Sequence, residues 1–139
     1  MHAGFCEYPV LKKLKDLVPD TCVITDVGSV KSTIHEAVRE LGMEARFIGG
    51  HPMAGSEKTG YASATDRLLE NAYYIITPTA LSNPDKVAEM RQLVTDTGAV
   101  PIVLNCEEHD YATAAISHLP HVIAYTLVNL VRTSDSREG

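Results

Sequence analysis

The apolar positions of this chain alternate between helical and strand-like spacing, and this alternation predicts the order of its elements. Between residues 9 and 17 apolar side chains recur every three or four positions and leave the lysines on the opposite side, which is typical of an amphipathic helix. Residues 22–25 form a short apolar run, typical of a strand buried on both faces of a parallel sheet. Helical spacing returns at residues 34–41, and Gly42 follows where a glycine commonly ends a helix.

The alternation continues to about residue 105, and the chain then becomes helical. Further strands are expected in the run that ends at Ile48, at residues 73–77 and at residues 100–104. Further helices are expected at residues 64–70, 83–98, 107–117 and 122–131. Pro101 marks the last strand as an edge strand, because proline cannot donate a hydrogen bond to a neighbouring strand. Pro120 is expected to separate the two final helices.

This order of elements predicts an α/β fold with a doubly wound parallel sheet of the Rossmann-like type. Four strands are few for such a sheet. The chain also contains no Gly-x-Gly-x-x-Gly sequence, which normally opens a dinucleotide-binding domain. We therefore expect a partial Rossmann-like sheet that belongs to a longer enzyme.

Charge and composition narrow the possible partners. The 139 residues carry a formal net charge of −6, which argues against nucleic acid and anionic membrane as partners, since both require clustered Lys and Arg. The three cysteines form no Cys-x-x-Cys pair, so neither a zinc site nor a disulfide framework is predicted. With no apolar run of about 18 residues and no signal-peptide pattern, we expect a cytoplasmic protein without a membrane partner.

Residues 47–57, Phe-Ile-Gly-Gly-His-Pro-Met-Ala-Gly-Ser-Glu, carry the strongest indication of chemistry. His51 stands between Gly50 and Pro52 at the end of a predicted strand. Glycine allows close approach of a ligand to the backbone, and proline fixes the backbone beside the imidazole. A histidine held in this way can exchange a proton near neutral pH. The alternative for an isolated Gly-His-Pro is a tight turn whose histidine caps a backbone carbonyl.

A second polar group follows the predicted strand at residues 22–25. Ligands of doubly wound sheets bind beyond the carboxyl ends of the strands. Neighbouring parallel strands lie about 5 Å apart, so we expect Ser29 within hydrogen-bond reach of His51. Ser29 would then be a nucleophile with its base or a residue that orients the base; the alternative is a helix N-cap. Lys31 either binds a carboxylate or phosphate or is solvated.

Two more histidines, His118 and His121, flank Pro120 in the segment Ser-His-Leu-Pro-His. This spacing is compatible with a metal, but no third ligand has clear spacing, so no metal site is predicted. The proline could aim one imidazole into a cleft. The alternative is a pair of partly exposed histidines at a helix junction.

Five segments in this order, taken together, resemble the prephenate and arogenate dehydrogenase family. They are Asp26–Lys31 (DVGSVK), Gly49–Glu57 (GGHPMAGSE) with Gly60, Ile76–Pro78, His109-Asp110 and Ser117–His121 (SHLPH). The similarity runs from about Pro19 to Leu130. It implies that residues 1–105 are the second half of a dinucleotide-binding domain. It implies also that residues 106–139 begin a truncated all-α dimerisation domain.

The resemblance implies an NAD- or NADP-dependent oxidative decarboxylation of prephenate or arogenate in tyrosine biosynthesis, carried out by a homodimer. His51 would accept the proton of the substrate hydroxyl, or would hydrogen-bond that hydroxyl as charge builds. Ser29 would hold the same hydroxyl and the histidine. The residues implied at the substrate are His121, His118, Ser56 and Glu57, the last two at the entrance. The residues implied at the cofactor are Asp26, Gly28, Ser29 and Pro52.

The sequence departs from the family pattern in lacking a glycine-rich phosphate loop and most of the helical domain. We therefore expect weak or absent activity from this chain alone. The other classes considered are a different dehydrogenase of the β-hydroxyacid type and a non-catalytic module for dimerisation or regulation. In the usual strand order residues 22–25 would form an unpaired apolar edge, which predicts self-association or a sheet order that covers this edge.

Overall fold

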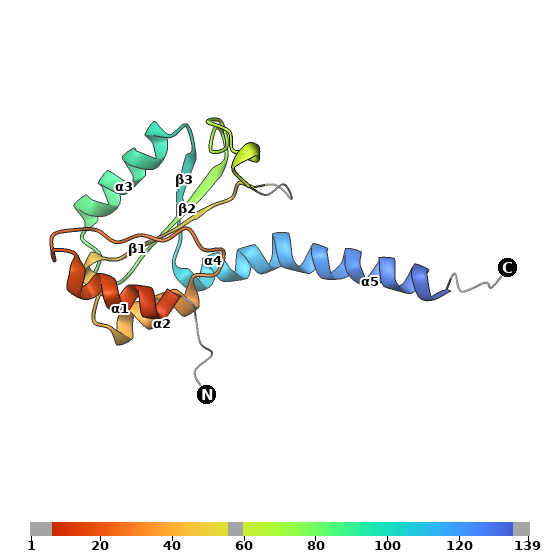
Figure 1. Ribbon diagram of the computed structural model, residues 1–139, viewed down its shortest axis with the longest axis horizontal. Coiled ribbons are helices and arrows are strands. Elements are labelled where there is room, and N and C mark those ends of the chain that lie inside the picture. The colour runs from red at the N-terminus through yellow and green to blue at the C-terminus, as the bar shows by residue number, and fades with distance from the viewer. Residues whose placement is uncertain (1–6, 56–59, 135–139) are drawn as a thin grey trace.

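The computed structural model describes residues 7–55 and 60–134 as an α/β unit followed by a long helix (Figure 1). The helices are α1 (Glu7–Leu17), α2 (Ser32–Glu40), α3 (Pro84–Asp96), α4 (Cys106–Thr113) and α5 (Leu119–Ser134). The strands are β1 (Ile48–Pro52), β2 (Tyr73–Pro78) and β3 (Val100–Val103). Short 3₁₀ turns occupy Glu44–Arg46 and Tyr61–Ser63, and a π-helical turn occupies Ala114–His118.

The three strands form one mixed sheet in the order β1-β2-β3. Strands β2 and β3 are parallel and are joined through α3, whereas β1 and β2 are antiparallel. The α/β class is thus confirmed, and Pro101 lies on an edge strand as predicted. The expectation of an entirely parallel sheet is wrong at β1.

The direction of β1 follows from the segment that connects it to β2. A helix was expected at residues 64–70, but the described part of this connection holds only the 3₁₀ turn at Tyr61–Ser63 and further turns. Parallel neighbours need a long crossover, usually a helix, whereas antiparallel neighbours do not. The described part of the connection holds no crossover helix, and β2 runs beside β1 in the opposite direction.

The expected strand at residues 22–25 is reduced to a single bridge. Ile24 pairs in parallel with Phe47, and its carbonyl accepts a hydrogen bond of 3.0 Å from the N–H of Ile48. Residues 22–25 therefore lie along β1, and no strand of the described residues covers their outer side. The self-association expected from this edge stays a prediction.

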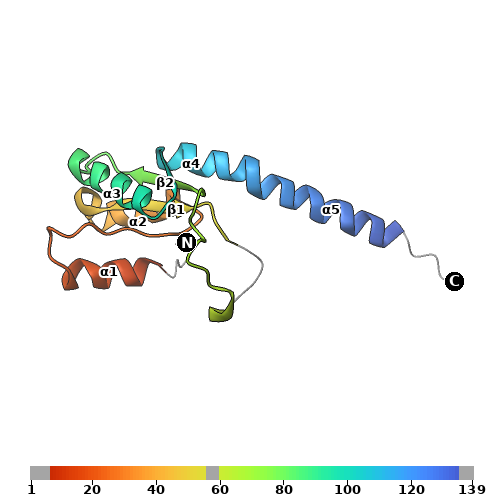
Figure 2. The ribbon, with the colours of Figure 1, turned by 90° about the horizontal axis from the view of Figure 1, so that it is seen from above.

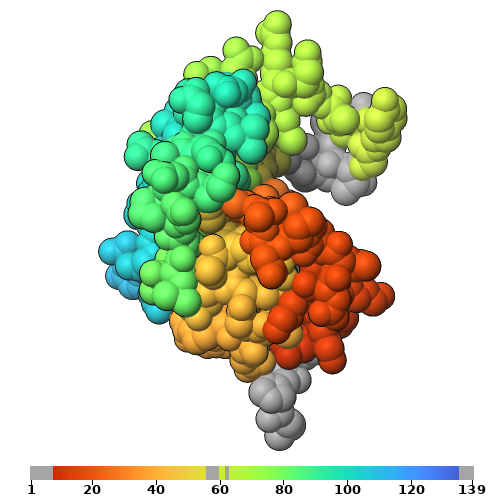
Figure 3. Space-filling model, turned by 90° about the vertical axis from the view of Figure 1, so that its left-hand side faces the viewer, coloured from red at the N-terminus to blue at the C-terminus, as the bar shows by residue number. Residues whose placement is uncertain are grey.

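Two apolar clusters hold the helices on the sheet. One joins α1 and α2 to Ile24 and Phe47, and the other joins α3 to β1 and β2. Met90 and Val94 are buried on the inner face of α3, as the helical spacing predicts. Figure 2 shows the helices around the sheet, and Figure 3 shows the face away from α5, where α3 lies above the α1–α2 pair.

The predicted helix ends are confirmed where capping chemistry defines them. The Asn83 side chain accepts a hydrogen bond of 2.8 Å from the N–H of Asp85, and Pro84 occupies the first position of α3. Gly42 ends α2 with a φ of +66°, a backbone conformation that L side chains rarely adopt.

The helices α4 and α5 run on through the π-helical turn as one helix of 29 residues, Cys106–Ser134. The expected break at Pro120 is wrong. Proline lacks an N–H and crowds the carbonyl four residues earlier, here that of Ile116. Ile116 lies within the wider π-helical turn, which accommodates the proline without ending the helix.

The α5 part of this long helix extends away from the rest of the molecule, and its apolar side chains are exposed. By length and composition alone the long helix as a whole could cross a membrane, contrary to the expectation that no apolar segment would be long enough. A helix that is apolar over much of its surface needs a partner to cover it.

Candidate active site

His51 occupies the fourth position of β1, where it pairs in register with Ile75 and is 9% exposed. The glycine before it is required by close packing. A Cβ on Gly50 would lie 2.6 Å from the hydroxyl of Tyr74 and 2.7 Å from the carbonyl oxygen of Asp26. Gly50 thus allows the turn after Ile24 to lie directly against β1, beside the histidine.

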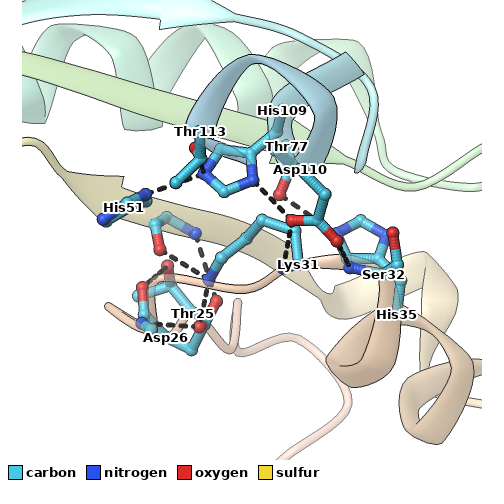
Figure 4. A network of polar contacts seen from close by, with 12 residues as sticks. Thr25, Asp26, Lys31, Ser32, His35, His51, Thr77, His109, Asp110 and Thr113 are labelled. Carbon is cyan, nitrogen blue, oxygen red and sulfur yellow. Dashed lines mark hydrogen bonds and ion pairs between the residues drawn. The ribbon is translucent and has the colours of Figure 1, made fainter. Parts of the chain in front are cut away.

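The closest polar partner of His51 comes from α4. Nδ1 of His51 lies 2.7 Å from Nε2 of His109, whose side chain is fully buried. Nδ1 of His109 in turn lies 2.8 Å from Oδ1 of Asp110. Figure 4 shows these three side chains in line, with the second ring nitrogen of His51 pointing away from His109.

Asp110 also caps the start of α2. Its Oδ1 accepts a hydrogen bond of 2.7 Å from the N–H of Lys31, and its Oδ2 accepts one of 2.8 Å from the N–H of Ser32. Burial by itself raises the pKa of the Asp110 carboxyl. Hydrogen bonds from Ser32, from the Lys31 N–H and from His109 outweigh this effect and lower the pKa to about 2. Asp110 is therefore a carboxylate at neutral pH.

Lys31 is completely buried and holds the turn after Ile24 against β1. Its Nζ donates to Oδ2 of Asp26 and, over 2.8 Å, to the carbonyl of Gly50. The Asp26 carboxylate also accepts from the N–H groups of Gly28 and Gly50. Of the alternatives for Lys31, solvation is wrong: the lysine binds a carboxylate of its own chain (Figure 4).

The environment of His51 favours its neutral form. Burial lowers the pKa of the imidazole, and the adjacent His109 ring and the Lys31 ammonium group lower it further, against smaller opposing effects of Asp26 and Asp110. A neutral imidazole can accept a proton at neutral pH, so this geometry provides a general base.

Ser29 is exposed, and no hydrogen bond joins it to His51 in the described structure, where His109 takes that place. Ser29 instead lines a pocket of about 160 Å³ together with His118. The other lining residues are Val30, Asp110 and Thr113. The structure thus brings two of the predicted site residues together at one pocket beside the Asp110 carboxylate.

The other predicted residues lie around this region or outside the description. The His121 ring contacts the carbonyl of Ser117 on its own helix at 2.8 Å and is exposed. Pro52 is half-buried at the end of β1. Ser56 and Glu57 lie outside the described residues. Within residues 7–55 and 60–134, no three His, Cys, Asp or Glu side chains are grouped to hold a metal ion.

His109 and Asp110 form one of the segments that resemble the family, but the sequence predicts no role for them; the structure places both at the centre of the site. A usable signal was present in the Asn-x-x-Glu spacing at residues 105–108. Asn105 and Glu108 form a reciprocal capping box at the start of α4. This box places His109 and Asp110 in the first turns of the helix.

Two family descriptions match this chain in sequence. Residues 7–103 match prephenate dehydrogenase, nucleotide-binding domain, and residues 105–138 match prephenate dehydrogenase, dimerization domain. The prephenate dehydrogenase of Bacillus subtilis (strain 168) is 42% identical over 115 residues, 82% of this chain and 31% of the relative. That of Lactococcus lactis subsp. cremoris (strain MG1363) is 45% identical over 111 residues, 78% of this chain and 29% of the relative. The chain spans less than a third of either relative.

Solved structures agree with these matches. The prephenate dehydrogenase of Aquifex aeolicus in complex with hydroxyphenyl propionate and NAD+ superposes with a TM-score of 0.84 and 32% identity. The match covers 94% of this chain and 45% of that one. Synechocystis arogenate dehydrogenase superposes with a TM-score of 0.81 and 35% identity, covering 94% of this chain and 46% of that one.

Proposed function

This chain belongs to the prephenate dehydrogenase family, and we propose that the complete protein catalyses the NAD-dependent oxidative decarboxylation of prephenate. Arogenate is the alternative substrate, because a structural neighbour is an arogenate dehydrogenase. NADP is the alternative cofactor. One observation carries the proposal: a buried histidine on β1 has one ring nitrogen engaged by His109 and the other directed away from that contact.

In this proposal His51 is the general base. Its free ring nitrogen accepts the proton of the substrate hydroxyl, so that a carbonyl forms at the ring carbon that is oxidised. A bound nicotinamide cofactor would supply the acceptor for the hydride of that carbon, and loss of the ring carboxylate as CO₂ would make the ring aromatic. Ser29 and His118 line the neighbouring pocket and are proposed to contact the substrate, with His121, Ser56 and Glu57 farther out.

The residues present fit a cofactor at the turn between Ile24 and α2. Val27 and Val30 are exposed on this turn beside Ser29, and they offer an apolar surface for a planar ring. Gly28 and Pro52 are proposed to lie along the same surface. Asp26 is proposed to act indirectly, because its carboxylate is already bound to Lys31, Gly28 and Gly50.

The pocket at Ser29 holds only part of a substrate site. Its volume of about 160 Å³ is smaller than the roughly 300 Å³ of the smallest usual ligand pockets. We propose that segments of the complete protein beyond this chain supply the remaining walls, and that this chain alone is weakly active or inactive.

The exposed apolar side chains of α5 fit the dimerisation domain that residues 105–138 resemble. We propose that this helix packs within a homodimer in the cytoplasm rather than in a membrane. The apolar surface would then be covered by protein, as is typical of obligate dimer interfaces.

The experiment is a steady-state assay of the complete protein with each substrate and each cofactor. His51→Asn is expected to lower kcat about 10²- to 10⁴-fold, the usual contribution of a general base. Glu89→Gln, an exposed change on α3, is the control and should leave kcat unchanged. Nearly full activity in His51→Asn, or no turnover of either substrate by the wild type, would contradict the proposal.

A further inference from the structure

Asp110, His109 and His51 form an unbroken line of hydrogen bonds from α4 to β1 (Figure 4). We propose that Asp110 and His109 are positioning residues that keep the proton of His51 on Nδ1. Its Nε2 is then the atom that accepts the substrate proton. The catalytic meaning of this inference rests on the proposed function, whereas the proton positions are inferred from the contacts within the chain with both imidazole rings neutral.

The first step concerns Asp110, whose carboxylate can accept hydrogen bonds but cannot donate them. Both of its carboxylate oxygens already face backbone N–H groups, those of Lys31 and Ser32. An ionised carboxylate cannot donate, so the contact of 2.8 Å with His109 requires a proton on Nδ1 of that histidine. Asp110 thereby fixes the orientation and the tautomer of the His109 ring.

The second step follows from that tautomer. A neutral imidazole with its proton on Nδ1 has an unprotonated Nε2, which can only accept. The contact of 2.7 Å between the two rings is then a hydrogen bond donated by Nδ1 of His51 to Nε2 of His109. The hydroxyl of Thr113, 3.4 Å from the same Nε2, can donate weakly to that atom as well. His51 keeps an unprotonated Nε2 that points away from His109.

The third step concerns the charge that forms when His51 accepts a proton. The new imidazolium can pass its Nδ1 proton to Nε2 of His109, which breaks one N–H bond and forms another. The positive charge then lies on the ring that contacts the Asp110 carboxylate rather than on the ring whose protonation Lys31 disfavours. Opposite charges in a buried site attract strongly, so the carboxylate stabilises the protonated histidine pair.

The same carboxylate also couples this arrangement to the packing of α4. Lys31, the N-cap residue of α2, caps no N–H group with its own side chain, and Asp110 supplies the cap from α4. The hydrogen bonds that hold α4 on α2 are thus made by the group that orients the two histidines. Displacement of α4 from α2 would therefore remove the hydrogen bonds that fix the tautomer of His51.

The test is ¹⁵N NMR of the histidine rings in the complete protein without substrate, followed by kcat with substrate. Wild-type His51 is expected to be protonated on Nδ1 and unprotonated on Nε2. In Asp110→Asn the amide can donate to Nδ1 of His109, so both rings should exchange tautomers and kcat should fall about 10²-fold or more. Tyr111→Phe, an 81% exposed change on the same helix, should alter neither the tautomer nor kcat.

If Asp110→Asn unfolds α2, the variants His109→Gln and His109→Leu test the inference instead. Both leave Asp110 in place as the cap of α2. In His109→Gln the side-chain carbonyl of the new glutamine can still accept a hydrogen bond from Nδ1 of His51. The proton of His51 should therefore stay on Nδ1, and kcat should fall less than in His109→Leu. A wild-type His51 protonated on Nε2 would overturn the inference. An unchanged tautomer with kcat within about twofold of wild type in His109→Leu would also overturn it.

The NMR result separates this inference from the proposed function. A protein with the expected tautomer but no dehydrogenase activity would reject the function and support the positioning role. An active dehydrogenase with the His51 proton on Nε2 would support the function and reject the positioning role.

Discussion

Nδ1 of His51 lies 2.7 Å from Nε2 of His109, although the two residues are 58 positions apart and belong to β1 and α4. Their ring centroids are 5.0 Å apart, with the ring planes inclined by 64°. The contact joins the segment that matches the nucleotide-binding domain to the segment that matches the dimerization domain. The first segment therefore supplies the candidate base, His51, and the second supplies the residue that contacts its ring, His109.

The first prediction concerns the pH dependence of kcat/KM in the complete protein. The pKa of His51 is lowered below its ordinary value of 6.5 by burial, by His109 and by Lys31, whereas Asp26 and Asp110 raise it by less. Because the neutral form is the base, activity should be retained at pH 6.5 and lost as the pH falls through the lowered pKa. His109→Gln removes one cause of the lowering and should move this loss to higher pH. A wild-type loss centred at or above pH 6.5 would contradict the prediction.

The second prediction concerns the buried pair of Lys31 and Asp26. Lys31→Met leaves a largely buried carboxylate without its cation, which should lower the free energy of unfolding by about 3–5 kcal/mol. Removing both charges in Lys31→Met/Asp26→Asn should cost less than the sum of the two single changes, because neither charge is then left unpaired. Urea denaturation of the four proteins measures this coupling. Strictly additive costs would show that the two side chains are not coupled.

The third prediction uses two glycines of the same segment. A Cβ at position 50 would clash with the Tyr74 hydroxyl and the Asp26 carbonyl, so Gly50→Ala must push the turn or the tyrosine away from β1. We expect a loss of about 1–3 kcal/mol in the free energy of unfolding, typical of overpacking. Gly55→Ala is the matched control, because a Cβ there meets no atom of the described residues within 4 Å. Thermal unfolding of both variants measures the difference in stability. Equal melting temperatures would show that close packing does not require a glycine at position 50.

Much of the fold was predictable because local chemistry determines it. Asn83 and Pro84 at the start of α3, Gly42 after α2 and Pro101 on the edge strand all lie where their backbone preferences place them. The direction of β1 was not predictable from its own residues. It depends on the connection between β1 and β2, where the sequence predicts a helix at residues 64–70 and the described residues form turns.

The site was predictable only in part, for a similar reason. The glycines and the proline around His51 indicate a constrained backbone, and the spacing of the strands placed Ser29 in the same region. The burial of Lys31 and the contact with His109 depend on how distant segments pack. Hydrogen bonds between residues so far apart leave no spacing in the sequence that could reveal them.

The fourth prediction concerns the exposed helix α5 and the proposed homodimer. Ile123, Leu127 and Leu130 recur at helical spacing and are each more than half exposed, so a partner chain would bury them together. Ile123→Asp would place a charge in that interface and should weaken the dimer of the complete protein at least about tenfold, or 1.4 kcal/mol. Ser134→Asp adds the same charge at the end of the helix and should leave association unchanged. Sedimentation velocity over a range of concentrations measures both variants, and an undiminished Ile123→Asp dimer would place the interface elsewhere.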